Sequence, residues 1–442
     1  MRSGAYGTIS VSGLRRIFRN ARILDPESGR DALGDLITVD ERIAAIGSHI
    51  SADGIGPDVE VIDCGGRCLA PGLVDMRVQL REPGAEHIES IESGSRAAAA
   101  GGVTTMVALP NTEPVVDDVS VVEFLARRAR EVKLAKVHTY GAATKGLAGK
   151  ELTEIGLLAA NGALGFTDGV KAIGNALVMR RVLSYARTFD QLVIQHPEEP
   201  SLGGAGEVNE GEIATRLGLA AIPPAAEVMM IERDLRLVAL TGARYHVAHV
   251  STAAAIDAIR QAKAKGLPVT CDTAPPYFAL NETAIGDYRT FAKLSPPLRG
   301  ESDREAVIDG IADGTIDAIA SDHAPWDQDS KRLPFSSASY GIVGLETLLP
   351  LSLELYHARH MRLIDVLRKL TIAPARILGL QVGRLVPGAP ADLVIFDADA
   401  EGRIRTDEFR SKSKNAPFDG RPVRGRVERT VVDSRTIFAR GE

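Results

Sequence analysis

Carboxylate and imidazole side chains recur in this sequence where short hydrophobic runs end. Asp168 follows one run, His196 and His249 follow two later ones, and Asp322 closes the last. Neutral imidazoles and carboxylates suit a borderline cation such as zinc, so these four residues form a candidate metal site. Each also has a simpler interpretation, because a buried histidine often packs in a core and an aspartate at a strand end often caps the next helix.

Further polar residues lie in the stretch APGLVDMRVQLREPG. Residues two apart on a strand point to the same face, so Arg77, Gln79 and Arg81 would project together from one strand end. His246 and His323 lie close to the candidate metal residues in the sequence, and we assign them structural roles.

Elements that could bring these residues together recur along the chain. Eight β-rich runs alternate with longer amphipathic segments typical of helices, such as VSVVEFLARRAREVKL. The predicted strands are 73–78, 104–110, 136–143, 162–168, 192–196, 245–251, 268–274 and 316–324. Eight strands alternating with helices favour a (β/α)8 barrel of the TIM type over an open doubly wound sheet. In such a barrel active sites form at the carboxyl ends of the strands, where the polar residues fall.

The two ends of the chain have a different pattern. Short strand-like runs broken by turns fill residues 14–69, and the C-terminal part, which contains GRLVPGAPADLVIFD, shares this pattern. We predict that residues 1–69 and 380–442 pair into one composite β-sandwich, and that residues 70–379 form the barrel.

Composition narrows the class of protein. The 442 residues are 45% hydrophobic and 25% charged, with a net charge of −6 and no basic stripe, so nucleic acid is not an expected partner. No apolar run approaches the length of a membrane span, and the N-terminal MRSGAYGTISVSGLRRIF lacks a secretory apolar core. Cys64, Cys68 and Cys271 form no paired framework, which favours free thiols in a reducing cytosol. We therefore expect a cytoplasmic protein without membrane contact.

Several ordered motifs resemble those of one known family. APGLVDMRVQLREPG, GGVTTMVALPNTEPV, HVAHVST, KLSPPLRGESDREAVIDGIADGTIDAIASDHAP and GLETLLPL are similar to motifs of the type I dihydroorotases of the amidohydrolase superfamily. The likeness covers nearly the whole chain. It implies a metal-dependent (β/α)8 barrel with a composite β-sandwich, and the reversible cyclisation of N-carbamoyl-L-aspartate to L-dihydroorotate in pyrimidine biosynthesis.

The resemblance also implies a role for each matching residue. In such enzymes a metal-bound hydroxide attacks the ring amide, and an aspartate of the eighth strand, here Asp322, shuttles the proton. Asp168 would bridge the metals, while His196 and His249 would hold the second metal.

Several positions depart from the family's pattern. Arg77 and Gln79 stand where the family has a His-x-His, and an arginine offers no lone pair to a cation. Trp326 stands where the family has a substrate-binding histidine, Ser295 replaces an asparagine, and residues 275–277 read Pro-Pro-Tyr instead of Pro-His-His. We therefore expect at most one zinc ion, held by the candidate metal residues, rather than a binuclear zinc centre.

Arg77 and Arg81, at the end of the first predicted strand, are expected to have different roles. The resemblance assigns the substrate carboxylate to Arg81 and Asn111, a bidentate task suited to a guanidinium. Two carboxylates facing a metal-free cavity would repel each other, and a second guanidinium would supply a fixed positive charge. We expect Arg77 to pair with Asp322 or Asp168 in place of a metal.

Three functions stay open from the sequence. The replaced ligands favour a protein that has lost the usual activity and serves as a structural or regulatory partner of aspartate transcarbamoylase, the preceding enzyme of the pathway. Retained Asp322, Arg81 and Asn111 keep open an active dihydroorotase with a single metal, or a related hydrolase for a carboxylate-bearing cyclic amide. We expect a homo-oligomer, and segment 321–341 is either a mobile lid or an ordinary strand-to-helix connection.

Overall fold

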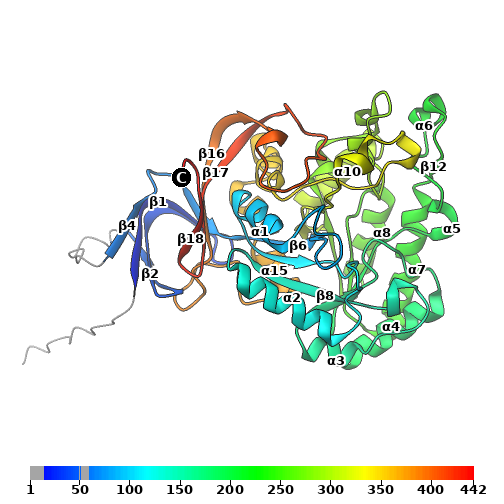
Figure 1. Ribbon diagram of the computed structural model, residues 1–442, viewed down its shortest axis with the longest axis horizontal. Helices are drawn as coiled ribbons and strands as arrows, with labels where there is room; N and C mark the ends of the chain where they lie inside the picture. Colours follow the sequence, from blue (N-terminus) through cyan, green and yellow to red (C-terminus); the bar gives the residue numbers. More distant parts are fainter. Residues whose placement is uncertain (1–13, 49, 51–58) are drawn as a thin grey trace, which may run out of the picture.

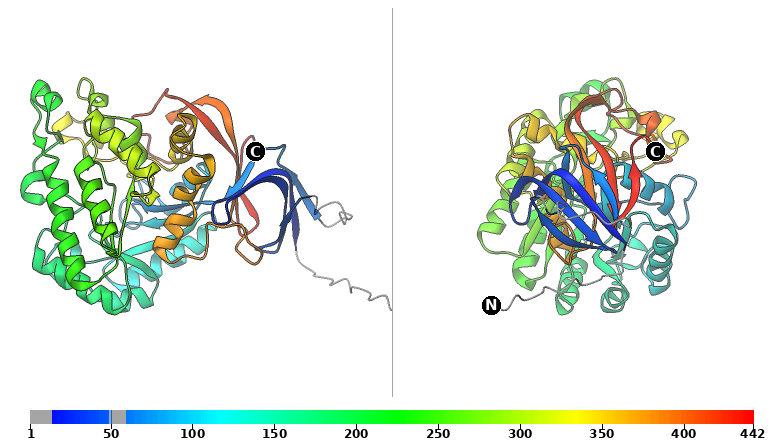
Figure 2. Two further views of the ribbon diagram at one scale, coloured as in Figure 1. Left: turned by 180° about the vertical axis from the view of Figure 1, so that it is seen from behind. Right: turned by 90° about the vertical axis from the view of Figure 1, so that its left-hand side faces the viewer.

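A computed structural model of the protein describes residues 14–48, 50 and 59–442. The expectation of no secretory segment falls largely on residues 1–13, which lie outside the described residues. A barrel surrounded by helices lies beside a β-rich part (Figure 1). Figure 2 shows the same arrangement from behind and from the side, with strands from both ends of the chain together in the β-rich part.

Eight parallel strands form the barrel, and each neighbours the next one along the chain. They are β6 (Leu73–Val78), β7 (Val103–Ala108), β8 (Lys136–Ala142), β9 (Ala163–Thr167), β10 (Val193–Gln195), β13 (Tyr245–Val247), β14 (Val269–Thr273) and β15 (Ala318–Ile319). The two outer strands of this order meet where Val78 pairs in parallel with His323 and the Gln79 N–H donates to the His323 carbonyl at 2.8 Å. The predicted barrel is confirmed, and each predicted strand overlaps one of these eight.

Helices follow the strands and cover the outside of the barrel (Figure 1). The longer ones are α1 (Ile91–Ala100), α2 (Val119–Val132), α4 (Ala176–Thr188), α7 (Ala225–Thr241), α8 (Ala253–Ala264), α10 (Glu301–Ala312) and α14 (Leu363–Leu370). Capping residues explain where two of these helices begin. Ser90 and Ser93 form a capping box at the N-terminus of α1, and the Asp118 side chain accepts the Ser120 N–H at the N-terminus of α2.

Shorter helices lie in the connections around the barrel. They are α3 (Ile155–Ala160), α5 (Pro200–Gly203), α6 (Glu212–Leu217), α9 (Pro275–Ala279), α11 (Gln328–Arg332), α12 (Leu348–Ser352), α13 (Glu354–His357) and α15 (Ile372–Leu378). Two short strands, β11 (Val208–Asn209) and β12 (Ala221–Ile222), pair with each other in the loop after β10. Segment 321–341 contains α11 and connects β15 to the helices that follow.

Strands from both ends of the chain form a second eight-stranded sheet. The strands are β1 (Arg15–Asp25), β2 (Arg30–Val39), β3 (Arg42–Gly47), β4 (Val59–Asp63), β5 (Cys68–Pro71), β16 (Leu393–Arg403), β17 (Pro422–Val432) and β18 (Arg435–Ala439). β5 joins the two halves, since it pairs parallel to β1 and antiparallel to β16. The sheet strands from the N-terminal segment therefore extend to Pro71, and β6 enters the barrel only two residues later.

Apolar packing and one ion cluster connect the sheet to the barrel. Val394, Phe396 and Val427 of the sheet belong to the same buried cluster as the barrel strands. Lys136 of β8 donates to both carboxylate oxygens of Asp392 at 3.0 and 2.8 Å and to Asp433 at 2.6 Å. A buried charge is stable only when it is paired, so this cluster ties the two parts together.

All three cysteines are buried free thiols, as the sequence predicts. Burial raises the pKa of the Cys64 and Cys271 thiols to about 12 and that of Cys68 to about 11. Within residues 14–48, 50 and 59–442, no helix has both the length and the apolar character needed to cross a membrane.

Candidate functional site

A cavity of about 660 Å³ opens at the carboxyl ends of the barrel strands. The predicted site residues that line it are Arg77, Gln79, Arg81, Asn111, His196, Ser295, Asp322 and Trp326. His249 contacts the buried side of this wall through Asp322 and His196. These side chains come together because all strands of a parallel barrel end at the same rim.

An ion pair between Arg77 and Asp322 occupies the centre of the site. Arg77 Nε donates to Asp322 Oδ1 at 2.8 Å, with 2% and 12% of the two side chains exposed. Arg77 Nη2 reaches the Gly169 carbonyl at 3.4 Å, so the guanidinium spans from the eighth strand end to the fourth. Of the two pairings expected from the sequence, the structure has the one with Asp322.

This environment keeps Asp322 ionised. Burial alone would raise the pKa of the carboxyl, but the charges of His249 and Arg77 and their hydrogen bonds outweigh it and hold the pKa well below its usual range. A carboxylate held in this way accepts hydrogen bonds readily and takes up a proton with difficulty.

The two predicted histidine ligands contact each other. His249 Nδ1 lies 3.0 Å from Asp322 Oδ2, His249 Nε2 lies 2.8 Å from His196 Nδ1, and His196 Nε2 lies 3.4 Å from Ser295 Oγ. These contacts join Asp322, His249, His196 and Ser295 in one continuous hydrogen-bonded chain. Burial, followed by the charges of His249 and Arg77, lowers the pKa of His196 well below its usual range, so this imidazole is neutral.

Asp168, the fourth predicted ligand, is satisfied elsewhere. The Thr144 N–H donates to its Oδ1 at 2.9 Å and the Thr144 hydroxyl donates to its Oδ2. Burial raises the pKa of Asp168, while these two bonds and further backbone donors lower it in part. Asp168 therefore links the loop after the fourth barrel strand to the loop after the third and is not part of the histidine chain.

The residues present do not fit the metal centre that the resemblance implies. The Arg77 guanidinium is hydrogen bonded to Asp322, and a fixed cation there repels a second cation. His196 Nδ1 and His249 Nε2 are directed at each other, and the second nitrogen of each ring contacts Ser295 or Asp322. Among the described residues, no three His, Cys, Asp or Glu side chains are grouped as a metal site.

The predicted carboxylate-binding residues, Arg81 and Asn111, contact Trp326 and Gln79. Arg81 stacks over the Trp326 ring at 4.2 Å and its Nε donates to the Pro325 carbonyl at 3.2 Å. Asn111 Nδ2 donates to Gln79 Oε1 at 3.0 Å. Burial lowers the pKa of Arg81 to about 10, which leaves the guanidinium charged at neutral pH. Trp326 and Gln79 thus position Arg81 and Asn111.

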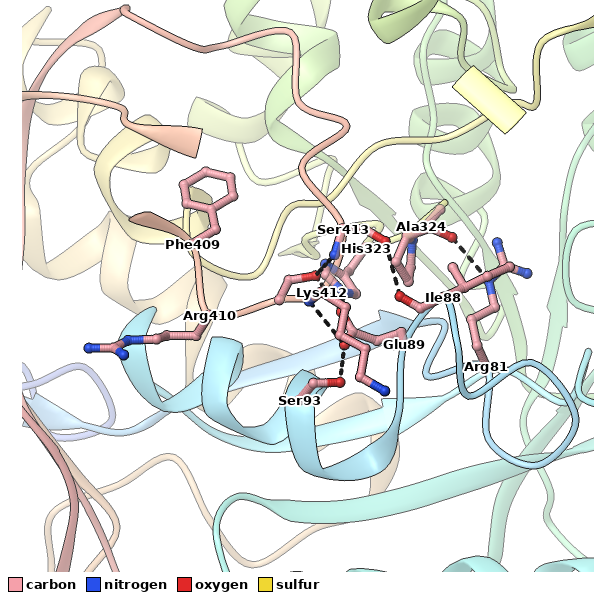
Figure 3. A network of polar contacts seen from close by, with 12 residues as sticks. Arg81, Ile88, Glu89, Ser93, His323, Ala324, Phe409, Arg410, Lys412 and Ser413 are labelled. Atoms are coloured by element: carbon pink, nitrogen blue, oxygen red, sulfur yellow. Dashed lines mark hydrogen bonds and ion pairs between the residues drawn. The ribbon is translucent and has the colours of Figure 1, made fainter. Parts of the chain in front are cut away.

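His323, predicted to be structural, lies in a buried network of polar contacts (Figure 3). Its Nδ1 accepts the Gly344 N–H at 3.1 Å, and its Nε2 lies 3.5 Å from Glu89. The Ser93 and Ser411 hydroxyls also donate to Glu89. His246, the other histidine predicted to be structural, contacts Thr270 and Asp272 on β14.

The segment that contains Ser411 also reaches the cavity rim. Asn415 Nδ2 donates to the Ala324 and Gly341 carbonyls at 3.1 Å, and Asn415 Oδ1 accepts the Trp326 N–H at 3.2 Å. A segment of the C-terminal part therefore holds both ends of the loop that carries Trp326.

Sequence reasoning missed several residues of the cavity lining, among them one carboxylate and one tyrosine. Glu198 lines it two positions after His196, and Tyr340 lines it at the end of the 321–341 loop. Tyr340 donates its hydroxyl to the Gly206 carbonyl at 2.6 Å, and its own carbonyl accepts the Trp326 indole N–H at 2.7 Å. The position of Glu198 directly after the fifth strand was the available signal.

Comparisons with known proteins agree with this architecture. The model of the Dihydro-orotase-like family matches residues 66–255, and that of the Amidohydrolase family matches residues 311–438. Dihydroorotase from Anaplasma phagocytophilum (strain HZ) is 49% identical over 422 residues, which are 95% of this chain and 94% of that protein. Dihydroorotase from Wolbachia sp. subsp. Drosophila simulans (strain wRi) is 46% identical over 429 residues, 97% and 96% of the two chains.

Solved structures share the fold. L-hydantoinase (dihydropyrimidinase) from Arthrobacter aurescens has a TM-score of 0.85 and 25% identity, with 97% of this chain and 96% of that chain covered. D-hydantoinase (dihydropyrimidinase) from Thermus sp. has a TM-score of 0.80 and 24% identity, with 97% of each chain covered. The barrel, the composite sheet and the strand-end site define an amidohydrolase fold. Within that class, the chain belongs to the dihydroorotase family.

Proposed function

We propose that this protein acts in pyrimidine metabolism on the ligand pair of the dihydroorotase reaction, N-carbamoyl-L-aspartate and L-dihydroorotate. The observation that carries the proposal is its similarity to relatives named Dihydroorotase, which are 43–49% identical over at least 94% of their own length. The cavity supports it, because Arg81 and Asn111 line its wall and a guanidinium is well suited to a carboxylate.

In the ring-opening direction, water adds to the ring amide carbon and the bond between this carbon and the ureido nitrogen breaks. One proton moves to that nitrogen, and the new carboxyl group loses another. In this proposal Arg77 supplies positive charge beside the reacting carbonyl oxygen. The neutral His196 and its neighbour His249 accept and pass on the proton, and Asp322 orients His249.

A second candidate function is a non-catalytic partner of aspartate transcarbamoylase. The observation that favours it is the Arg77–Asp322 ion pair, which holds the expected proton shuttle as a carboxylate and excludes a cation from its side. The cavity would then retain its ligands without converting them, and the folded chain would act through its surface.

One experiment separates these candidates. The purified protein is analysed for metal content and assayed for cyclisation and ring opening, with and without added zinc. The Arg77→His/Gln79→His double variant serves as the comparison, because it restores the family's histidine pair. We expect turnover by the untreated protein at ordinary enzymatic rates, about 1 per second or faster.

Absence of turnover in the wild type, together with zinc binding and activity in the double variant, would contradict the first candidate. Co-purification of such an inactive protein with aspartate transcarbamoylase would support the second. A stoichiometric metal in contact with Asp168 and Asp322 in the wild type would overturn the assignment of Arg77 as the substitute for a metal.

A further inference from the structure

A second cavity, of about 450 Å³, lies where the composite sheet meets the barrel. Its walls are residues of β16, β17 and β18, the connection 404–410, Ala100 of α1 and Pro350 of α12. No described residue lines both this cavity and the one at the barrel rim. Cavities of about 300–1,000 Å³ commonly hold small molecules, so the volume allows a ligand at this second place.

Arginine is the most frequent charged residue of the wall. Among the described residues, the lining includes Arg403, Arg405, Arg410, Arg426 and Arg440. Two of these are paired with a nearby carboxylate: Arg405 Nη2 lies 3.2 Å from Asp407, and Arg426 Nε lies 2.9 Å from Glu428. The charges of these two guanidinium groups are therefore already neutralised on the protein surface.

The other three arginines have no carboxylate partner within residues 14–48, 50 and 59–442. Arg403 Nη1 donates to the Gly420 carbonyl at 2.8 Å, and Arg440 Nε donates to the Val427 carbonyl at 3.0 Å. Figure 3 shows the Arg410 side chain directed away from the contacts around Glu89. All three residues are exposed, so a solute can reach their guanidinium groups.

The acidic residues of the wall do not balance these charges. Glu401 pairs with Arg424 at 3.0 Å, and Glu408 lies 3.6 Å from Arg405. Glu346 accepts two backbone N–H groups, and burial raises its pKa to about 7, so its carboxyl carries less than a full charge at neutral pH. The cavity thus keeps a surplus of positive charge that an anion would neutralise.

Two aromatic rings lie in the same wall. Phe409 and Phe438 both line the cavity and are half-buried. Phe438 lies beside one of the three free guanidinium groups, with Arg440 Cζ 5.9 Å from the ring centre. An aromatic side chain stacks with any nucleobase, and a guanidinium binds phosphate oxygens in a bidentate manner. The wall therefore suits a ligand that joins phosphate groups to a flat ring.

We propose that this cavity is a binding site for a nucleoside diphosphate. The diphosphate meets Arg403, Arg410 and Arg440, and the base lies against Phe409 or Phe438. A nucleoside diphosphate carries about three negative charges at neutral pH, which matches the three arginines without a carboxylate partner. The proposal does not rest on the proposed function, because the site is separate from the barrel rim.

The test is a ligand series on the full-length wild-type protein, measured by titration calorimetry at low ionic strength, where exposed charges are least screened. The ligands are uridine diphosphate, adenosine diphosphate, pyrophosphate, which lacks the nucleoside, and uridine, which lacks the phosphates. We expect both diphosphates to bind at submillimolar concentration and about 10-fold or more tightly than pyrophosphate or uridine. Their own affinities should agree within about 10-fold, because stacking is available to either base.

Each result of this series decides one part of the proposal. Equal affinity for uridine diphosphate and pyrophosphate contradicts the role of the rings and leaves an anion site. Equal affinity for uridine diphosphate and uridine contradicts the role of the arginines. No binding of uridine diphosphate at millimolar concentration overturns the proposal and leaves the proposed function intact.

Variants assign the binding to this cavity. Arg410→Met and Arg440→Met should each weaken uridine diphosphate about 10-fold or more, because each removes a charge-assisted contact. Arg405→Met is the matched control within the wall, and its effect should stay below about 3-fold because Arg405 is already paired. Arg236→Met, at an exposed position of α7, should have no effect.

Two outcomes of the variant series would overturn the assignment. An equal loss in Arg405→Met and Arg410→Met would show a general attraction of anions to a basic surface. A loss in Arg81→Met, with binding retained in Arg410→Met, would place the ligand at the barrel rim. The exposed positions make folding of the arginine variants of this cavity expected, and the wild-type series stands if one of them does not fold.

Discussion

At the scale of residues, the polar side chains at the barrel rim pair with one another. Arg77 neutralises Asp322, Gln79 accepts a hydrogen bond from Asn111, and Trp326 lies against Arg81. These contacts are two hydrogen-bonded pairs, one of them an ion pair, and one cation–π contact.

Removal of Arg77 is therefore expected to destabilise the folded protein. Arg77→Met leaves Asp322 as a buried carboxylate without its guanidinium, which costs about 3–5 kcal/mol of unfolding free energy. Arg77→Met/Asp322→Asn is expected to recover most of this loss, because no charge is then left unpaired. Chemical denaturation of the four proteins of this cycle measures the coupling, and additive losses would show that the pair is not the cause.

At the scale of elements, a C-terminal segment holds the loops of the barrel rim. Ser411 and Asn415 come from the connection between β16 and β17, and they contact Glu89 and the loop with Trp326. Glu346 also holds this C-terminal segment, because its Oε1 accepts the N–H groups of Arg410 and Ser411 at 2.7 and 3.2 Å. Segment 321–341 is thus tied at both ends, and Lys331 fixes its interior by donating to the Ser339 and Gly341 carbonyls.

The Glu346 contact is expected to give a pH-dependent stability. Burial raises the pKa of Glu346 from 4.5 to about 7 in the folded protein. The folded state then binds the proton more tightly than the unfolded state, so this contribution is complete below pH 4.5 and is lost as the pH rises to 7. Glu346→Gln keeps an acceptor oxygen without a charge. Between pH 5 and pH 7.5 the wild type should lose up to about 3 kcal/mol more unfolding free energy than this variant, and equal losses would contradict the assignment.

At the scale of the whole molecule, the two ends of the chain meet in one sheet that packs on the barrel. β5 lies between β1 and β16, so residues from both termini are needed for continuous pairing. The buried cluster shared by β16, β17 and the barrel strands continues the core across the junction.

Loss of the polar contact at this junction should weaken the attachment of the sheet. Lys136→Met leaves Asp392, with 3% of its side chain exposed, without its cation. We expect a loss of about 3 kcal/mol in unfolding free energy, and a partial recovery when Asp392→Asn is added. Thermal unfolding followed by circular dichroism measures both, with the exposed Lys150→Met as the control. An unchanged midpoint in Lys136→Met would show that apolar packing alone holds the junction.

The amino-acid sequence by itself determined the barrel. Strand periodicity, helix caps and the spacing of the eight runs are local properties, and a (β/α)8 barrel follows from their order. The rim position of Arg77, Arg81, Asn111, His196 and Asp322 was predictable for the same reason, because the strand ends of a parallel barrel share one face.

Only the tertiary structure decided how these side chains pair. The sequence offered two partners for Arg77, Asp322 and Asp168. In the structure Arg77 pairs with Asp322, and Asp168 accepts the Thr144 N–H. The contact between His196 and His249 depends on separations of a few ångströms between distant segments. Such separations are set by the packing of the whole barrel, whereas the types of residue at its rim can be predicted from the sequence alone.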